Sequence, residues 1–152
     1  GGEKPKAPAT TLVVLLVGGE GVRDPYSIPG DPGVREPFVV AAVGDERQRT
    51  RCGGFTDNPT WGQALRFELN PRAAGSVIRF AVFDKHVASA ENFMGDVEIA
   101  LSDIVRAVRA SAAPQVPFRI QLFSRPDPFI GPKKCGVLTI SVSIEDPKPV
   151  GE

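Results

Sequence analysis

Histidine and cysteine are scarce in this sequence, and their scarcity excludes several kinds of site. The 152 residues include one histidine, His86, and two cysteines, Cys52 and Cys135. Two cysteines that lie far apart in the chain form neither a disulfide framework nor a zinc ligand set. A single histidine with no cysteine close to it in the sequence leaves little for nucleophilic catalysis. We therefore expect a protein of the reducing cytoplasm that is not an enzyme.

Long apolar runs and an excess of charge are also absent. The longest purely apolar runs, such as Leu12–Val17, are far shorter than the about 20 residues that a membrane-spanning helix needs. Lysine plus arginine number 18, as do aspartate plus glutamate, so the formal net charge is zero. Because nucleic-acid-binding domains are usually basic, we expect no nucleic-acid partner. Gly18–Gly21 lacks the third glycine of a dinucleotide-binding motif, and the sequence contains no P-loop.

Glycine and proline, with 16 and 15 residues, divide the chain into short apolar segments. About eight of these segments are predicted to be strands, most of them alternating apolar and polar residues as a strand with one buried face does. The expected strands are Leu12–Val17, Phe38–Val43, Arg47–Cys52, Trp61–Leu69, Val77–Phe83, Val97–Leu101, Val116–Leu122 and Leu138–Ile144. The first is apolar throughout, so we expect it to be buried on both faces.

One segment has the spacing of a helix instead. Ser102 is a favoured capping residue, and the apolar residues after it recur at helical intervals, so we predict a helix over Ser102–Ala110. Strands throughout, with this short helix between strands 6 and 7, predict an all-β fold, an eight-stranded antiparallel β-sandwich. Trp61 and Phe67 fall on the inward face of their strand. We expect flexible segments at 1–10 and 147–152 on either side of one domain at 11–146.

The order of several short motifs resembles the C2 domain family. Residues 31–38 (DPGVREPF) are similar to the family segment that ends in Asp-Pro-Tyr. In the family, a basic strand then precedes an Asn-Pro-x-Trp motif. The corresponding segments of this sequence are 47–51 (RQRTR) and 58–63 (NPTWGQ). Residues 82–86 (VFDKH) and 93–95 (FMG) resemble the strand ending in Asp-x-Asp and the close of its loop. The resemblance covers 11–146 and ends in a glycine-led strand, Gly136–Ile144, which implies the circularly permuted type II topology.

That topology implies that four loops lie at one end of the sandwich, at 18–36, 53–59, 84–93 and 124–135. In the family, the first and third of these loops supply five aspartates that bind Ca²⁺. The corresponding residues of this sequence are Asp31, Glu36, Asp84, His86 and Asn92. Imidazole and amide groups are poorer ligands than carboxylates for this hard cation. We therefore expect a degenerate metal site formed by Asp31, Glu36, Asp84 and Asn92, and no required cofactor.

Two further sets of residues are candidates for lipid binding. Arg47, Arg49 and Arg51 alternate along one expected strand, so they share a face, and the corresponding strand of the family contacts phosphoinositide head groups. Other head-group candidates are Lys133 and Lys134, and the membrane-loop candidates are Tyr26, Ile28, Phe129 and Ile130. In the alternative interpretation the arginines cover a solvated sheet face and the loop hydrophobes pack inward.

Because the metal ligands are incomplete and the net charge is zero, the sequence favours a calcium-independent interaction module. Such a module would make protein–protein or scaffold contacts within a larger protein, as centrosomal, ciliary and trafficking C2 proteins do. The alternative is a peripheral membrane-binding domain that recognises anionic lipid or phosphoinositide with weak Ca²⁺ dependence. We expect a monomeric domain in the cytoplasm, peripheral to a membrane or a cytoskeletal structure. The type II arrangement implies neighbouring strands for Cys52 and Cys135, so a disulfide between them stays an alternative to free thiols.

Overall fold

Strands make up most of the structure, a computed structural model that describes residues 9–24, 36–70, 75–85 and 92–148. The strands are β1 (Thr10–Glu20), β2 (Pro37–Val43), β3 (Glu46–Arg49), β4 (Thr60–Leu69), β5 (Val77–Asp84), β6 (Asn92–Ala100), β7 (Val116–Phe123) and β8 (Lys134–Glu145). The helix, α1 (Leu101–Ala110), connects β6 to β7. The predicted all-β architecture with one short helix between strands 6 and 7 is therefore confirmed.

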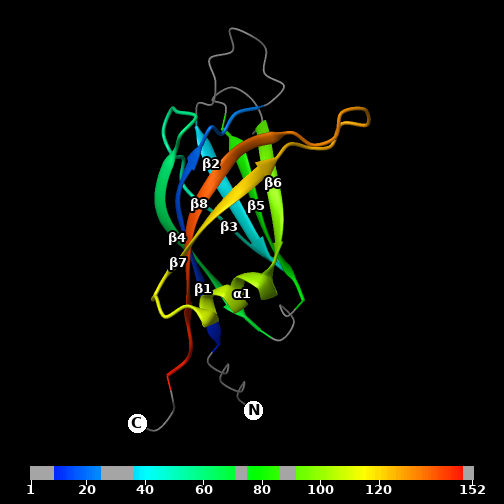
Figure 1. The fold of residues 1–152 in the computed structure, drawn as a ribbon. Coiled ribbons are helices and arrows are strands. Elements are labelled where there is room, and N and C mark those ends of the chain that lie inside the picture. The colour runs from blue at the N-terminus through cyan, green and yellow to red at the C-terminus, as the bar shows by residue number, and fades with distance from the viewer. Residues whose placement is uncertain (1–8, 25–35, 71–74, 86–91, 149–152) are drawn as a thin grey trace, which may run out of the picture.

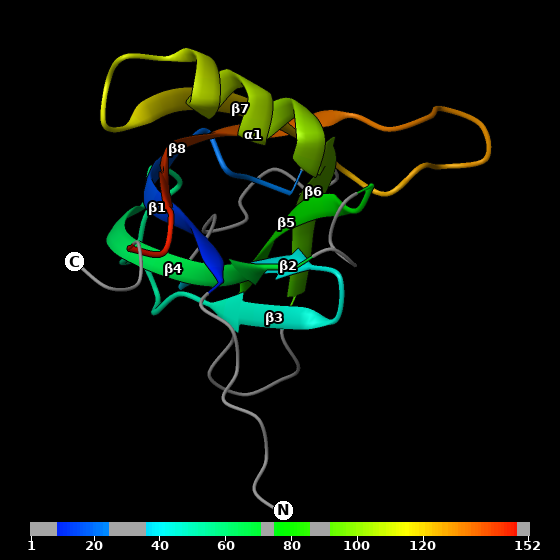
Figure 2. The same ribbon diagram turned by 90° about the horizontal axis from the view of Figure 1, so that it is seen from below.

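The strands pair antiparallel in the order β3-β2-β5-β6-β7-β8-β1-β4. The β6–β7 step consists of one pair, Asp96 with Phe123. Because so little pairing joins these two strands, the sheet divides there into two layers, β3-β2-β5-β6 and β7-β8-β1-β4, which face each other across the core (Figures 1 and 2). This arrangement is the sandwich that the sequence predicts.

Glutamine side chains link the two edge strands, β3 and β4, on the other side of the sandwich. The Gln48 amide donates from Nε2 to the Arg66 carbonyl and accepts at Oε1 from the Arg66 N–H, at 3.3 Å. Just past the end of β3, the Arg51 N–H donates to Gln63 Oε1 at 2.9 Å. These side-chain amides bond backbone groups that edge strands would otherwise present to other chains.

The core is formed by alternate residues of both layers, as the sequence pattern predicts. Trp61 is 3% exposed and Phe67 is 0% exposed, which confirms their expected core positions. The expectation that the first strand is buried on both faces is wrong. Inward-facing residues of β1 such as Leu12 are fully buried, but Val17 is 37% exposed, because the outer face of its layer meets solvent.

Helix α1 lies across the lower end of the sandwich in Figure 1 and buries Leu101, Ile104 and Val108. It begins one residue earlier than predicted, and Ser102 is not its cap. Ala100 occupies the N-cap position without a side-chain hydrogen bond, and the Leu101 N–H instead donates to the Ser76 carbonyl at 3.0 Å. At 10 residues α1 is too short to cross a membrane, and the described segments contain no other candidate span.

An ion pair ties the end of α1 to the end of β8. Arg109 donates to both carboxylate oxygens of Asp146, with Nη2 2.8 Å from Oδ1, and Thr10 Oγ1 donates to Oδ1 at 3.1 Å. The Arg109 hydrogen bond lowers the pKa of Asp146 from its usual 3.8 to about 2. The pair therefore joins the helix to the end of the last strand and the start of the first.

Phe80 is 0% exposed at the centre of the core, so the substitution Phe80→Ala should lower the free energy of unfolding by roughly 3–5 kcal/mol. The matched control is Phe129→Ala, which removes the same atoms from a side chain that is 95% exposed and should change stability by less than about 0.5 kcal/mol. Urea denaturation followed by far-ultraviolet circular dichroism measures both. Equal losses for the two variants would mean that the inward face is assigned wrongly.

The Asp146 carboxylate should add pH dependence to stability. Its pKa is lower in the folded state than the usual 3.8, so it stabilises the fold above about pH 4, and this contribution disappears as the pH falls through about 2. The substitution Asp146→Asn should therefore lower the urea midpoint at about pH 6 and have little effect near pH 2. A constant difference between the two proteins across this range would contradict the assignment.

Candidate functional site

Strands β1, β3, β5 and β7 all end on the side of the sandwich opposite α1, where the described residues 21–24, 50–59 and 124–133 of the following loops lie (Figure 1). Backbone hydrogen bonds connect the described parts of these loops. The Gly19 N–H donates to the Pro59 carbonyl at 2.9 Å, and the Val22 N–H donates to the Asp57 carbonyl at 2.8 Å. The Arg23 N–H donates to the Cys135 carbonyl at 3.4 Å. We call this the loop end, and its position agrees with the arrangement expected from the sequence.

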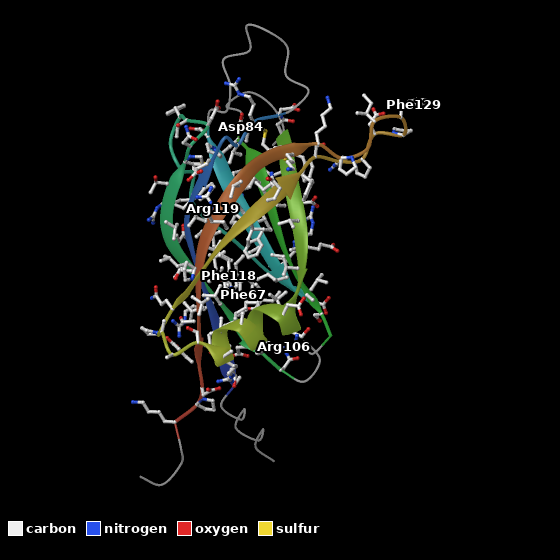
Figure 3. All side chains as sticks on the ribbon, in the orientation of Figure 1. Phe67, Asp84, Arg106, Phe118, Arg119 and Phe129 are labelled. Carbon is white, nitrogen blue, oxygen red and sulfur yellow. The ribbon has the colours of Figure 1, made fainter. Side chains whose placement is uncertain are left out.

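Of the predicted metal ligands at the loop end, the structure describes Glu36, Asp84 and Asn92. Asp84 is 4% exposed, and its Oδ1 accepts the Glu36 N–H at 2.7 Å (Figure 3). Asn92 is exposed, with Nδ2 3.8 Å from the Met94 sulfur. The part of the chain that the structure describes holds no group of three or more His, Cys, Asp or Glu side chains able to bind a metal. The remaining positions, Asp31 and His86, lie outside the described residues.

The three predicted arginines separate, because β3 ends at Arg49. Arg47 and Arg49 pair with Ala42 and Val40 and face outward from the β3-β2-β5-β6 layer, as predicted. The expected strand Arg47–Cys52 is too long, and Arg51 does not continue this face. Its Nη2 donates to the Trp61 carbonyl at 3.1 Å, across the gap between the two layers.

Thr50 explains why the strand stops there. It is 2% exposed, and its Oγ1 accepts the Val39 N–H at 3.0 Å and donates to the Arg51 carbonyl at 2.8 Å. The Thr50 N–H still donates to the Val39 carbonyl at 2.9 Å, but the Thr50 side chain takes the second bond of this pair, so the regular pairing of β3 with β2 ends here. The alternation of arginines in the sequence therefore overstates the length of the basic strand.

Arginine and phenylalanine side chains form a continuous row on the same outer face, next to the loop end. The Arg49 guanidinium lies 4.0 Å from the centre of the Phe38 ring, and the Arg125 guanidinium lies 4.5 Å from that of Phe93. Between them, Phe38 stacks on Phe83 and Phe83 meets Phe93 edge-on, each with ring centres 5.7 Å apart. We call these five residues the arginine–aromatic row. It extends from β3 across β2, β5 and β6 to the loop after β7.

Charged side chains on this face include an ion pair and three exposed arginines. Arg79 donates to the Asp96 carboxylate, with Nη2 2.8 Å from Oδ2, so these two charges neutralise each other. Arg47, like Arg49 and Arg125, is exposed to solvent. The row itself contains no acidic side chain. The upper part of the face can therefore attract anionic groups.

Large apolar side chains are exposed at the tips of two loops at the same end. Phe129 is 95% exposed and Ile130 is 64% exposed, at the tip of the hairpin that joins β7 to β8 (Figure 3). Phe55, in the loop after β3, is 77% exposed and was not expected from the sequence. Its position between Gly54 and Thr56, outside any alternating strand, is the signal that could have identified it. The other loop candidates, Tyr26 and Ile28, lie outside the described residues.

Comparison with known proteins gives consistent matches. A sequence profile of the C2 domain family matches residues 10–117. Over 74 residues the chain is 31% identical to the Arabidopsis thaliana protein C2-DOMAIN ABA-RELATED 11, covering 49% of this chain and 43% of that protein. Over 116 residues it is 33% identical to human 1-phosphatidylinositol 4,5-bisphosphate phosphodiesterase delta-3, covering 70% of this chain and 14% of the enzyme. The chain thus spans less than half the length of either relative.

A solved structure shows a similar fold. A C2 domain of plant extended synaptotagmin 1 superposes with a TM-score of 0.71, over 95% of this chain and 100% of that chain, at 19% sequence identity. At this identity the likeness concerns the fold and not the ligand.

The two cysteines are free and lie in different layers, so the disulfide alternative is wrong. Cys52 follows β3, at the edge of one layer, whereas Cys135 is in β8, between β7 and β1. These strands are not neighbours, in contrast to the sequence expectation. Cys135 is 3% exposed, and a Cβ at Gly95 would come within 2.2 Å of its sulfur. Burial, with smaller effects of the Asp96 and Asp24 carboxylates, raises the pKa of Cys135 to about 11.

The two thiols should therefore react differently with an alkylating reagent. At about pH 8 the native protein should gain one iodoacetamide adduct, at the partly exposed Cys52, because Cys135 is both buried and protonated there. The urea-unfolded protein should gain an adduct at both cysteines without any reductant. Peptide mass spectrometry identifies the modified residue. Rapid modification of Cys135 in the native protein would contradict its burial.

Proposed function

Because the chain belongs to the C2 domain family, we propose that it is a non-enzymatic binding module that attaches to anionic membrane surfaces without a requirement for Ca²⁺. The observation that carries this proposal is the arginine–aromatic row, in which three phenylalanines in ring contact connect two exposed arginines beside the loop end. Arg47 extends the same face along β3. Anionic lipid, with phosphoinositide as the preferred class, is the proposed ligand.

Contact with the aromatic rings prepares these arginines to bind phosphate. A guanidinium that is held over a ring by cation–π attraction carries N–H groups that can donate in pairs to phosphate oxygens. The ring holds the side chain in place, so less conformational entropy is lost when a head group binds. A C2 domain whose arginines are held in this way can bind lipid phosphates by itself.

The same residues that weaken the metal site support independence from Ca²⁺. His86 and Asn92 stand where the family has aspartates, which removes two anionic ligands. One oxygen of Asp84 already accepts the Glu36 N–H, and this bond fixes the start of β2 against the end of β5. The retained carboxylate can therefore be explained by its structural role alone.

The sequence alone favoured a protein or scaffold partner, and the geometry favours the alternative. The arginine–aromatic row combines residues of β3, β2, β5 and β6 with Arg125 of the β7–β8 hairpin. The guanidinium groups of this row suit phosphate. One relative is named as a phosphodiesterase of phosphatidylinositol 4,5-bisphosphate, which is consistent with a role at phosphoinositide-containing membranes. We place the module at residues 11–146 and propose that it acts as a monomer, peripheral to a cytoplasmic membrane surface.

The double substitution Arg47→Gln/Arg49→Gln should weaken binding to phosphatidylcholine vesicles that contain phosphatidylserine and phosphatidylinositol 4,5-bisphosphate. Each cation near an anionic surface contributes about 1 kcal/mol, so the partition coefficient should fall roughly 30-fold. Vesicle co-sedimentation measures it, at low and at physiological salt, with Ca²⁺ or with a chelator. Binding of the unsubstituted chain should weaken with salt and be the same in Ca²⁺ and in chelator.

The matched control is Arg106→Gln/Arg119→Gln, which removes the same charge from α1 and from the outer face of the other layer (Figure 3). These arginines pair with Asp103 and Glu20 at exposed positions, so their loss should leave both folding and vesicle binding nearly unchanged. Equal effects of the two double substitutions would mean that vesicle binding depends on the total positive charge and not on the face that carries the row. Absence of vesicle binding by the unsubstituted chain would contradict the lipid function and favour a protein partner.

A further inference from the structure

The hairpin between β7 and β8 projects from the sandwich beyond β6 (Figures 1 and 2). It comprises residues 124–133, and hydrogen bonds close its base on both strands. The Ser124 N–H donates to the Lys133 carbonyl at 2.8 Å, and the Lys133 N–H donates to Ser124 Oγ at 2.9 Å. Ser124 is only 6% exposed, so the hairpin leaves the domain from a fixed point.

The tip of the hairpin is held in one turn. The Phe129 N–H donates to Asp127 Oδ1 at 2.8 Å, and the Gly131 N–H donates to the Asp127 carbonyl at 3.1 Å. Gly131 has a φ of +74°, which glycine adopts without strain. Prolines at 126, 128 and 132 restrict the backbone further. The turn therefore presents Phe129 and Ile130 to solvent from a shape that exists before any partner binds.

The composition around this tip suits a lipid surface. Arg125, Lys133 and Lys134 flank the two apolar side chains, and the one acidic residue of the hairpin, Asp127, has an oxygen engaged in the turn. Apolar side chains between cations are typical of segments that insert at the boundary between head groups and acyl chains. A protein partner would need an apolar pocket with acidic walls, which is a narrower requirement.

We infer that the β7–β8 hairpin is a second, calcium-free membrane anchor, whose Phe129 and Ile130 insert among the lipids while the arginine–aromatic row holds head-group phosphates. The inference deepens the proposed function and rests on it. Arg125 joins the two parts, because it belongs to the base of the hairpin and lies over Phe93 in β6. The row and the tip therefore contact one bilayer together, and each increases the effective concentration of the other at the surface.

Vesicle binding of Phe129→Ser/Ile130→Ser tests the anchor. Transfer of each side chain out of water should contribute roughly tenfold to partition, so the double substitution should weaken binding about a hundredfold. The vesicles contain phosphatidylcholine, phosphatidylserine and phosphatidylinositol 4,5-bisphosphate, as above. Because both side chains are exposed, the urea midpoint should not change, which excludes misfolding as the cause. Unchanged vesicle binding would overturn the inference and leave the tip for a protein partner.

Insertion can also be observed directly with Phe129→Trp. The natural tryptophan, Trp61, is 3% exposed and supplies a constant background. On vesicle binding the new indole should shift its emission to the blue and be quenched by brominated acyl chains. The matched control, Phe55→Trp, places the same group on the exposed loop after β3 and should show a smaller response. Quenching of the indole at position 129 by aqueous acrylamide alone, in a vesicle-bound protein, would overturn the inference.

Soluble inositol 1,4,5-trisphosphate separates failure of the anchor from failure of the proposed function. This probe carries the phosphates of the lipid without acyl chains. Phe129→Ser/Ile130→Ser should bind it as the unsubstituted chain does, whereas Arg47→Gln/Arg49→Gln should bind it more weakly. Loss of binding to this probe in the hairpin variant would mean that the tip supports the row instead of inserting. If Phe129→Ser/Ile130→Ser weakens vesicle binding and Arg47→Gln/Arg49→Gln does not, the membrane anchor is supported and the proposed head-group site is wrong.

Discussion

Antiparallel pairing of β2 with β5 is the contact on which the loop end depends. Its register places Phe38 beside Phe83 and Pro37 beside Asp84. The first pair forms the centre of the arginine–aromatic row, and the second brings the Asp84 carboxylate to the Glu36 N–H. A shift of one residue would turn Phe38 into the core and Val39 outward, because side chains alternate between the faces of a strand. The surface proposed to bind lipid and the packing of the core therefore both depend on the register between β2 and β5.

Asp84 illustrates how a carboxylate that resembles a metal ligand can act as a structural group. It is almost fully buried, where a charge is stable only with hydrogen-bond partners, and the Glu36 N–H is one of these. This bond fastens the chain as it enters β2. In the proposed function, attraction to anionic lipid comes from arginine and lysine and not from a bound cation. The exposed arginines and the flanking lysines of the hairpin supply that charge on the outer face and at the tip.

Head-group binding and insertion are assigned to different parts of the domain, and Arg125 connects them. Its guanidinium completes the row at Phe93, and its backbone begins the hairpin that carries Phe129. A row held by contacts between its rings and guanidinium groups and a tip held by Asp127 need little reordering on contact with a bilayer. Two weak contacts on one rigid body can then bind a surface that neither would hold alone.

The sequence by itself determined the approximate positions of the strands and of α1, and the core positions of Trp61 and Phe67, because strand alternation and helical spacing are local patterns. It also identified Phe129 and Ile130 as loop residues, because prolines and glycine interrupt any strand there. Only the tertiary structure decided that Arg51 turns to the Trp61 carbonyl, that the two cysteines lie in different layers, and that Phe93 meets Arg125. These outcomes depend on hydrogen bonds and packing between segments far apart in the chain, such as the side-chain bonds of Thr50, and no local spacing records them.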